Sequence, residues 1–294
     1  MKHTRLLVAA SLLAGPAFAQ QDFSKVEIKT EQLAPGVAVL FGQGGNIGVS
    51  YGEDGTVLID DQFAPLTEKI QKAVADLGAQ PVKFLINTHW HFDHTGGNEN
   101  FGKAGALIMA HDNVRVRMAT DQETAFGLIK ASPKAALPVV TYAEGLKLHL
   151  NGEEVRVMSV APAHTDGDSI IHWTKSNVIH MGDLFFHKMS YPFIDRGSGG
   201  DVRGVIAAAA KALTMADDAT KIIPGHGPVA SKAELQAYHD MLVAITSKID
   251  AAIKGGKSVE EVKAMKPADG YGVNPSGFIS ADRFVETVYA NLKG

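Results

Sequence analysis

The first third of the chain contains short segments typical of β-strands, of which residues 26–33 alternate between apolar and polar with a two-residue period and residues 37–41 are continuously apolar. Residues 47–51 and 56–60 lie on either side of Gly52-Glu53-Asp54-Gly55, a sequence that favours a hairpin turn. At Leu66 the period changes to that of a helix, which ends at Gly78. The first half is therefore predicted to contain strands at 26–33, 37–41, 47–51, 56–60, 82–87 and 106–110, a helix at 66–77 and one or two helices at 113–129.

The second half repeats the order of strands followed by helices. Its predicted strands are 139–142, 146–150, 154–160, 169–173, 177–181 and 221–223, and its predicted helices are 202–216, 232–254, 258–265 and 281–292. Two β-rich halves that each lead into helices predict an α/β protein, an αββα sandwich of two packed mixed β-sheets with helices on the outer faces. Since no low-complexity linker divides the chain, we expect residues 20–294 to form a single domain with a helical C-terminal tail.

The first 19 residues have a different pattern. Lys2 and Arg5 give a positive start, residues 6–14 are apolar, and Ala17-Phe18-Ala19 matches the small-x-small pattern of a cleavage site. The apolar run is far shorter than the roughly 20 residues needed to span a bilayer, so no membrane insertion is expected. We expect a signal peptide cut after Ala19 and a mature protein that is periplasmic or secreted.

The composition narrows the chemistry. The chain has 294 residues, of which 45% are hydrophobic and none is cysteine. An exported protein without disulfides depends on its apolar core, and a chain of this length can bury one. The lack of cysteine excludes a thiolate nucleophile or metal ligand. Without Lys2 and Arg5, 26 basic residues remain against 32 acidic ones, a net charge near −6 with no basic run, so nucleic acid is not an expected partner.

The densest chemical signal is Thr-His-Trp-His-Phe-Asp-His at residues 88–94. His89, His91, Asp93 and His94 fall within six positions, directly after an apolar strand. Imidazole and carboxylate groups suit Zn²⁺ and its divalent neighbours. In an extended segment, side chains two apart point the same way, so His89 and His91 can bind one ion. Asp93 and His94 are displaced where the strand becomes a loop, so this one loop is predicted to contribute ligands to two metals.

Three further candidates lie far along the chain, each just after a predicted strand. His164 lies in Ala163-His164-Thr165-Asp166, Asp183 in Gly182-Asp183, and His226 in Pro224-Gly225-His226-Gly227. Each alone has an ordinary interpretation, as a loop histidine, a cap residue or a turn residue. Only their combination with the 88–94 run favours a metal site.

In this order the motifs resemble the metallo-β-lactamase superfamily, from about residue 37 to residue 227. Asp60 also matches the acidic strand end that precedes the family's histidine run. The resemblance implies one zinc ion on His89, His91 and His164, and a second on Asp93, His94 and His226, with Asp183 as the bridging carboxylate. Asp60 would support this site from behind the ligands, or would only flank the helix at 66–77.

The resemblance implies a zinc-dependent hydrolase with two Zn²⁺ ions per chain. Zinc lowers the pKa of a bound water to about 7, and a second ion can share the hydroxide and stabilise the leaving group. Asp93 would hold this metal-bridging hydroxide and collect its proton. The expected substrate is a small molecule with a hydrolysable acyl bond, and the expected reaction opens a lactam, lactone or thioester.

Which acyl bond is opened stays undecided at this point. Export and length favour a β-lactamase-like enzyme, although the best-known zinc β-lactamases have a cysteine at the position of Asp183 and no histidine at that of His94. The presence of both residues is closer to glyoxalase II and lactonase-type hydrolases. Those β-lactamases bind the substrate carboxylate with a lysine where this chain has Phe186. Lys188 would fill that role if the loop is longer, and is otherwise an exposed lysine on a surface loop. A non-catalytic periplasmic zinc-binding protein is the alternative from another class.

Overall fold

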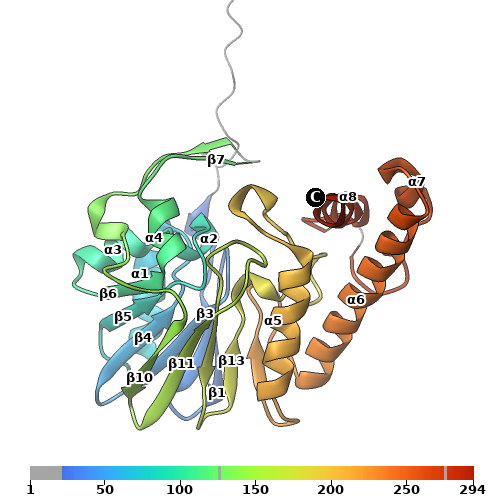
Figure 1. Ribbon diagram of the computed structural model, residues 1–294. Coiled ribbons are helices and arrows are strands. Elements are labelled where there is room, and N and C mark those ends of the chain that lie inside the picture. The colour runs from blue at the N-terminus through green and yellow to red at the C-terminus, as the bar shows by residue number, and fades with distance from the viewer. Residues whose placement is uncertain (1–21, 125–126, 275–276) are drawn as a thin grey trace, which may run out of the picture.

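The computed structural model describes residues 22–124, 127–274 and 277–294. The expected signal peptide and its cleavage site lie outside these residues. Two β-sheets pack face to face between two layers of helices (Figure 1). The αββα sandwich expected from the sequence is confirmed. No helix in the described part of the chain combines the length and apolar character that a bilayer crossing requires.

The first sheet has seven strands from the first half of the chain. In spatial order they are β1 (Lys29–Ala34), β2 (Val37–Phe41), β3 (Ile47–Gly52), β4 (Gly55–Ile59), β5 (Val82–Ile86), β6 (Leu107–His111) and β9 (Val140–Tyr142). Strands β1 to β4 are antiparallel, whereas β4, β5, β6 and β9 are parallel, so the sheet is mixed. Parallel neighbours need crossover connections, which α1 (Thr67–Asp76) and α3 (Asn98–Lys103) provide.

The second sheet has five strands. They are β10 (Gly145–Leu150), β11 (Glu153–Ser159), β12 (Ser169–Trp173), β13 (Val178–His180) and β14 (Lys221–Ile223). Both β11 and β13 are antiparallel to β12, and β14 is parallel to β13. Strands β11, β13 and β14 therefore run in the same direction, and their carboxyl ends meet at one edge of the sheet.

Three apolar clusters separate the four layers. Val57 and Ile59 of β4 pack between the sheets against residues such as Trp173, whereas Leu58 faces the other way, towards α1. Strand β4 is buried throughout because both of its faces are covered. On the far face of the second sheet, α5 (Val202–Met215) and the C-terminal helices bury a third cluster.

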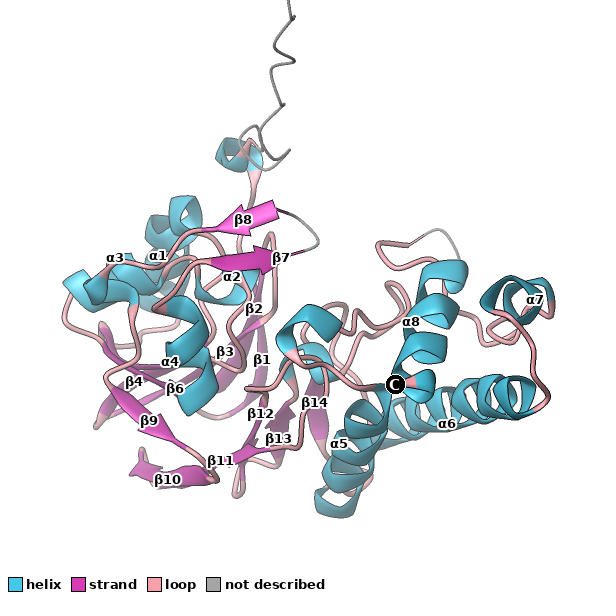
Figure 2. Ribbon diagram, turned by 45° about the horizontal axis from the view of Figure 1, so that its top comes forward, coloured by secondary structure: helices cyan, strands magenta, loops and turns pink. Residues whose placement is uncertain are grey.

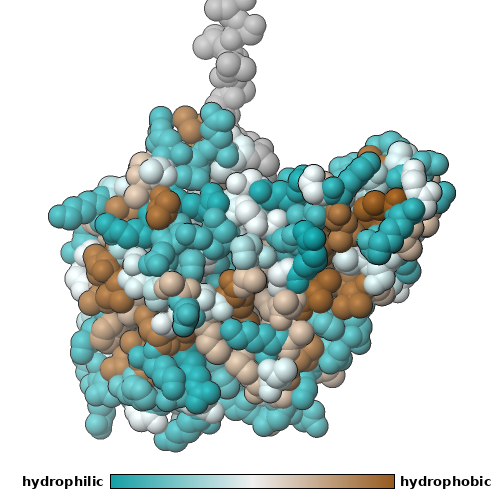
Figure 3. All heavy atoms as spheres, in the orientation of Figure 1, coloured by the Kyte–Doolittle hydropathy of each residue, from teal (hydrophilic) through white to brown (hydrophobic). Residues whose placement is uncertain are grey.

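The helical tail predicted from the sequence consists of α6 (Lys232–Lys254), α7 (Val259–Ala264) and α8 (Ala281–Lys293). Ser231 and Glu234 form a capping box at the start of α6, which satisfies backbone N–H groups there. Leu242 of α6 and Phe284 of α8 belong to the same buried cluster. In the space-filling view, hydrophilic residues cover most of the visible face, and a brown apolar patch lies beside these helices (Figure 3).

The helical prediction for residues 113–129 is wrong beyond its first turns. Helix α4 (Asp112–Met118) is followed by two short antiparallel strands, β7 (Gln122–Thr124) and β8 (Gly127–Ile129). Val114 and Met118, four residues apart, are the buried residues of α4. Beyond Met118 the chain leaves the core, so burial no longer supports a helix. In Figure 2, strands β7 and β8 lie above α4.

Candidate metal centre

The histidine run leaves β5 as a loop and then enters a short helix, α2 (Phe92–Thr95). His91 is the N-cap residue with extended backbone, and Asp93 and His94 occupy the first turn of the helix. The continuous extended geometry expected for His89 and His91 is therefore replaced by a turn. The turn brings the rings together, with the centroid of His89 4.9 Å from that of His91 and 4.2 Å from that of His94.

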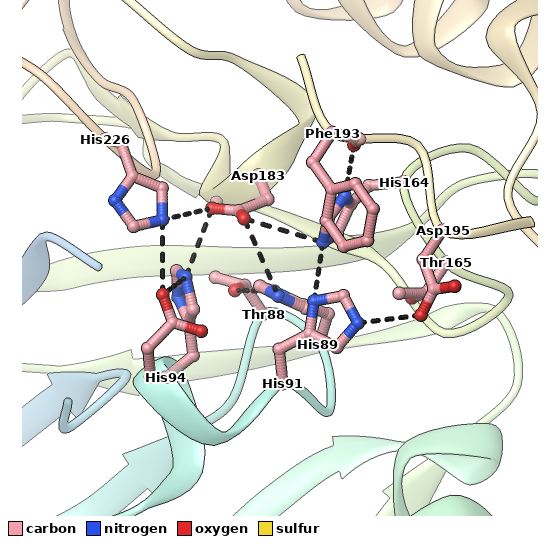
Figure 4. A network of polar contacts seen from close by, with 12 residues as sticks. Thr88, His89, His91, His94, His164, Thr165, Asp183, Phe193, Asp195 and His226 are labelled. Carbon is pink, nitrogen blue, oxygen red and sulfur yellow. Dashed lines mark hydrogen bonds and ion pairs between the residues drawn. The ribbon is translucent and has the colours of Figure 1, made fainter. Parts of the chain in front are cut away.

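The three distant candidates come from the edge of the second sheet where like-directed strands end. His164 follows β11, Asp183 lies in a 3-10 turn after β13, and His226 lies in the loop after β14. Because this edge faces the histidine run, all three side chains point towards it (Figure 4). The structure therefore brings together seven residues that the sequence predicted as one cluster: His89, His91, Asp93, His94, His164, Asp183 and His226.

Four of these residues form a first ligand group, which consists of His89, His91, His164 and Asp183. Their nearest ring nitrogens and the Asp183 carboxylate lie within 4.8 Å of one another. Nδ1 of His91 is 2.9 Å from Nε2 of His164, which is itself 3.5 Å from Oδ2 of Asp183. All four residues are buried.

A second ligand group consists of Asp93, His94 and His226. Oδ2 of Asp93 lies 3.6 Å from Nε2 of His94 and 3.3 Å from Nε2 of His226. Oδ1 of Asp183 is 3.1 Å from Nε2 of His94 and 3.3 Å from Nε2 of His226. Asp183 therefore directs one carboxylate oxygen to each group, as Figure 4 shows.

Each histidine has an outer ring nitrogen, which faces away from the cluster, and an inner one, which faces into it. In four histidines the partner of the outer nitrogen decides which of the two carries the proton of the neutral ring. Nδ1 of His94 lies 2.8 Å from Asp60, Nε2 of His91 lies 3.0 Å from Asp195, and Nδ1 of His164 lies 2.6 Å from the carbonyl of Phe193. The same holds for Nδ1 of His89, 3.0 Å from Thr88 Oγ1, whose own hydroxyl donates to Asp60. These acceptors favour a proton on each outer nitrogen, so each inner nitrogen presents a lone pair whenever its ring is neutral.

Lone pairs that converge without a donor fit a cation. Nε2 of His89, Nε2 of His94 and Oδ1 of Asp183 are buried and have no hydrogen-bond partner among the described residues. Such atoms are costly to bury unless something satisfies them. Imidazole and carboxylate donors are the set that zinc accepts. The residues present therefore fit a metal centre.

The two groups differ in protonation. Burial lowers the pKa of His164 to about 4 and, with neighbouring imidazoles, holds the pKa of His89 well below its usual value. Burial also tends to lower the pKa of His94 and of His226, but the adjacent carboxylates outweigh this effect. Those carboxylates raise the pKa of His94 well above its usual value and that of His226 to about 9. The same imidazoles lower the pKa of Asp93 to about 2 against the effect of its burial.

Two carboxylates hold ligand residues from behind. Asp60 is buried, accepts from the backbone N–H and the hydroxyl of Thr88, and contacts His94. The structure thus places Asp60 against the cluster rather than at the helix end alone. Asp195 plays the corresponding part for His91 and also accepts from the hydroxyl of Ser198. The sequence did not reveal Asp195, because no motif surrounds it.

A further support that sequence reasoning missed joins the loops of Asp183 and His226. Nδ1 of His180 accepts from the N–H of Gly182, and its Nε2 lies 3.0 Å from the carbonyl of Asn46. The side-chain amide of Asn46 donates to the carbonyls of Pro224 and Gly227, on either side of His226. One buried histidine and one buried asparagine therefore connect both loops.

Glycine is required where the backbone approaches the ligands most closely. A Cβ at Gly45 would lie 2.1 Å from the His94 ring, and one at Gly225 would lie 2.1 Å from Oδ1 of Asp183. Lys188, in contrast, lies outside the cluster. Its Nζ is 2.6 Å from Glu234, and its side chain is 65% exposed.

The structure is thus an α/β sandwich with a histidine–carboxylate cluster that could hold metal ions. Residues 41–226 match the model of the metallo-β-lactamase superfamily, which is more than half of the chain. The chain belongs to this superfamily, and the resemblance seen in the sequence is confirmed.

Curated relatives differ in what they do. The chain is 22% identical over 219 residues to the α-subunit of a 2,4-dinitroanisole O-demethylase from Nocardioides sp.. This alignment covers 73% of this chain and 62% of that protein. The chain is 27% identical over 165 residues to a hydroxyacylglutathione hydrolase from Polaromonas sp., and this alignment covers 55% of each protein. The chain thus spans less than two thirds of the length of either relative.

Solved structures share the fold. A metallo-β-lactamase from Pontibacter korlensis superimposes with a TM-score of 0.62 at 19% identity, covering 74% of this chain and 99% of that one. The sec-alkylsulfatase Pisa1 from Pseudomonas sp. has a TM-score of 0.68 at 15% identity, covering 89% of this chain and 50% of its own. At these identities the likeness shows the fold alone.

Proposed function

We propose that this protein is an exported hydrolase that binds two zinc ions and opens a cyclic amide or ester in a small molecule. The observation that carries the proposal is the position of Asp183, with one carboxylate oxygen facing each ligand group. A single carboxylate shared in this way suits a pair of ions better than one. The superfamily match and the paired His/Asp groups support metal-dependent hydrolysis.

Each ligand has a definite part in this proposal. His89, His91 and His164 would hold one ion, Asp93, His94 and His226 the other, and Asp183 both. Two bound zinc ions would supply a hydroxide near neutral pH and polarise the substrate carbonyl. Asp93 lines the cavity beside the cluster, and 23% of its side chain is exposed, so its carboxylate can orient a water molecule and accept its proton.

The proposed reaction consumes one water molecule for each acyl bond that is broken. The oxygen of one water molecule bonds to the acyl carbon, and the bond from that carbon to the ring nitrogen or oxygen breaks. The leaving nitrogen or oxygen takes the proton that Asp93 accepted, and the new acid loses its own proton to solvent. Neither a serine nor a cysteine nucleophile is needed.

A glyoxalase II-like thioesterase is the second candidate. It is favoured by the likeness to hydroxyacylglutathione hydrolases and by the presence of His94 together with Asp183. A non-catalytic zinc-binding protein is less consistent with a cavity that opens onto Asp93 and His226.

Metal analysis and turnover test the proposal together. Purified protein should contain two zinc ions per chain and hydrolyse at least one of a chromogenic cephalosporin, a homoserine lactone and lactoylglutathione. Chelation with EDTA should abolish hydrolysis, and added zinc should restore it. Stable metal without turnover on any acyl substrate would instead support the binding protein, and turnover of the thioester alone would support the thioesterase.

Export is tested separately. Cell fractionation should recover the mature protein outside the cytoplasm, with an N-terminus at Gln20 by mass spectrometry. A cytoplasmic protein that retains residues 1–19 would contradict this part of the proposal.

A further inference from the structure

A cavity of about 510 Å³ opens beside the candidate metal centre. The polar part of its lining consists largely of the cluster itself, with Asp93, Asp183 and His226 among the residues exposed to it. The remaining lining is mainly apolar and rich in aromatic side chains. Those that matter here are Phe63, Phe92, Ile129, Phe186, Phe193 and Phe278.

Four of these phenylalanines form two pairs on different parts of the chain. Phe63, just after β4, contacts Phe92 of α2 with ring centroids 5.8 Å apart. Phe193 contacts Phe278 at 6.0 Å and also stacks on His91 at 5.8 Å. A substrate whose acyl carbon reaches the cluster would therefore meet aromatic rings from both halves of the fold.

Exposed apolar side chains mark the opening of the cavity. Phe278 and Met189, both lining residues, are 62% and 53% exposed. Large apolar side chains left exposed around a concave site are typical of a surface that binds an apolar ligand.

Lysine and arginine side chains are lacking in this lining. Among the described residues that line the cavity there is no lysine or arginine. Lys188 pairs with Glu234, and the guanidinium of Arg283 packs over the ring of Phe193, 5.8 Å from its centroid, without lining the cavity. A carboxylate on the substrate would be desolvated beside Asp93 and Asp195 with no lysine or arginine to pair with it. The positive charge that remains is that of the metal centre and His226, which the carboxylates of Asp93, Asp183 and Asp195 offset.

We infer that the substrate is an uncharged ester or lactone with an aromatic or alkyl group, rather than a compound that carries a free carboxylate. This inference rests on the proposed function and narrows it. Penicillins, cephalosporins and glutathione thioesters all carry carboxylates, so they rank below neutral esters as substrates. In the reaction, water adds to the acyl carbon, the acyl carbon–oxygen bond breaks, and the leaving alcohol takes a proton.

A matched pair of esters tests the charge preference directly. 4-Nitrophenyl butyrate and 4-nitrophenyl hemisuccinate share the leaving group and chain length and differ by a methyl group against a carboxylate. For the zinc-loaded protein, kcat/KM for the butyrate should exceed that for the hemisuccinate by about tenfold or more, after correction for their rates with free zinc. Equal rates, or a preference for the hemisuccinate, would overturn the inference.

Substitutions at the opening of the cavity test which residues cause the preference for the neutral ester. Phe278→Ala should raise KM for the butyrate about fivefold, because an aromatic contact is lost. Val139→Ala is the matched control, since Val139 is 68% exposed and does not line the cavity. Met189→Lys should improve hemisuccinate hydrolysis relative to Met189→Gln. If Arg283→Gln selectively impaired the hemisuccinate, Arg283 would be an anion anchor and the inference would be wrong.

A binding measurement separates this inference from the proposed function. A neutral solvatochromic naphthyl ketone and its carboxylate analogue report on the cavity by fluorescence without hydrolysis. Stronger binding of the neutral probe, weakened by Phe278→Ala, with no ester turnover would sustain the inference about the cavity and refute the hydrolase. Ester turnover without any preference for the neutral substrate or probe would sustain the hydrolase and refute the inference.

Discussion

The two ligand groups differ in burial and in charge. In the first group, His89, His91 and His164 are buried, and the one carboxylate, that of Asp183, is shared with the second group. In the second group, the side chains of Asp93 and His226 are 23% and 21% exposed and line the cavity. Asp183 is the only one of the seven residues whose contacts reach into both groups through two different oxygens.

This difference suggests separate parts for the two groups. Burial keeps the imidazoles of His89 and His164 neutral, which prepares them to bind a metal at neutral pH. The second group carries protons in the absence of metal, because its carboxylates stabilise charged imidazoles. We therefore expect the first group to hold its ion more tightly, and the exposed group to exchange metal and to meet substrate.

Replacing the shared carboxylate should have the largest effect. Asp183→Asn removes the charge that serves both groups, so both metals should be lost and activity should fall by more than about 100-fold, beyond the loss typical of a residue that only supports a ligand. Metal content by mass spectrometry and kcat/KM measure this. Asp121→Asn, at an exposed ion pair with Lys130, is the matched control. Retention of one full equivalent of metal would show that Asp183 serves only one group.

Removing one imidazole from each group should separate them. His226→Ala should leave about one tightly held metal per chain, whereas His164→Ala should weaken the tighter site, because it opens the buried group. Both variants should lose most activity, since a shared nucleophile needs both ions. Competition with a coloured chelator measures the two affinities. Equal residual affinities in the two variants would contradict the assignment of a tight and an exchangeable group.

The supporting carboxylates should have smaller effects, that of Asp195 on the first group and that of Asp60 mainly on the second, whose His94 it contacts directly. Asp195→Asn should weaken the metal held with His91, and Asp60→Asn the metal held with His94, each by about 10- to 100-fold. Both substitutions keep the shape of the side chain, which limits the loss of packing. If metal affinity were unchanged while only thermal stability fell, these residues would be structural rather than positioning residues.

Proton release should be the subtlest sign of the difference. The pKa of metal-free His226 is raised to about 9, so its ring is protonated at pH 7 and has to lose a proton before it can bind zinc. His164, with its pKa lowered to about 4, has none to lose. Calorimetric zinc titrations in buffers of different ionisation enthalpy should show release at pH 7 that disappears above about pH 9. Release that does not depend on pH would contradict this protonation.

The same shift affects the stability of the metal-free protein. Because the folded pKa of His226 lies above its unfolded value of 6.5, this group's contribution is fully present below pH 6.5 and is lost as pH rises through about 9. Zinc-loaded protein, in which the ring is neutral, should not show that loss.

Local sequence patterns predict most of the helices and strands of this protein. Strand β4 and helices α5 and α6 lie within a few residues of their predicted positions, because period and capping residues are read from neighbours in sequence. The hairpin β7–β8 was mistaken for helix because its short strands lack a buried face to set a period. The seven candidate ligands were recognisable because four form one run and three carry the superfamily's glycine- and strand-end context.

Tertiary structure decided what no run of residues contains. Asp195 reaches His91, and His180 reaches the carbonyl of Asn46, only when the two halves of the fold pack together. The cavity and its aromatic lining likewise depend on Phe63 and Phe193, which lie far apart in the chain, meeting around one site. Sequence fixes side-chain chemistry and local period, whereas burial, hydrogen-bond partners and the sign of each pKa shift depend on which distant groups packing brings together.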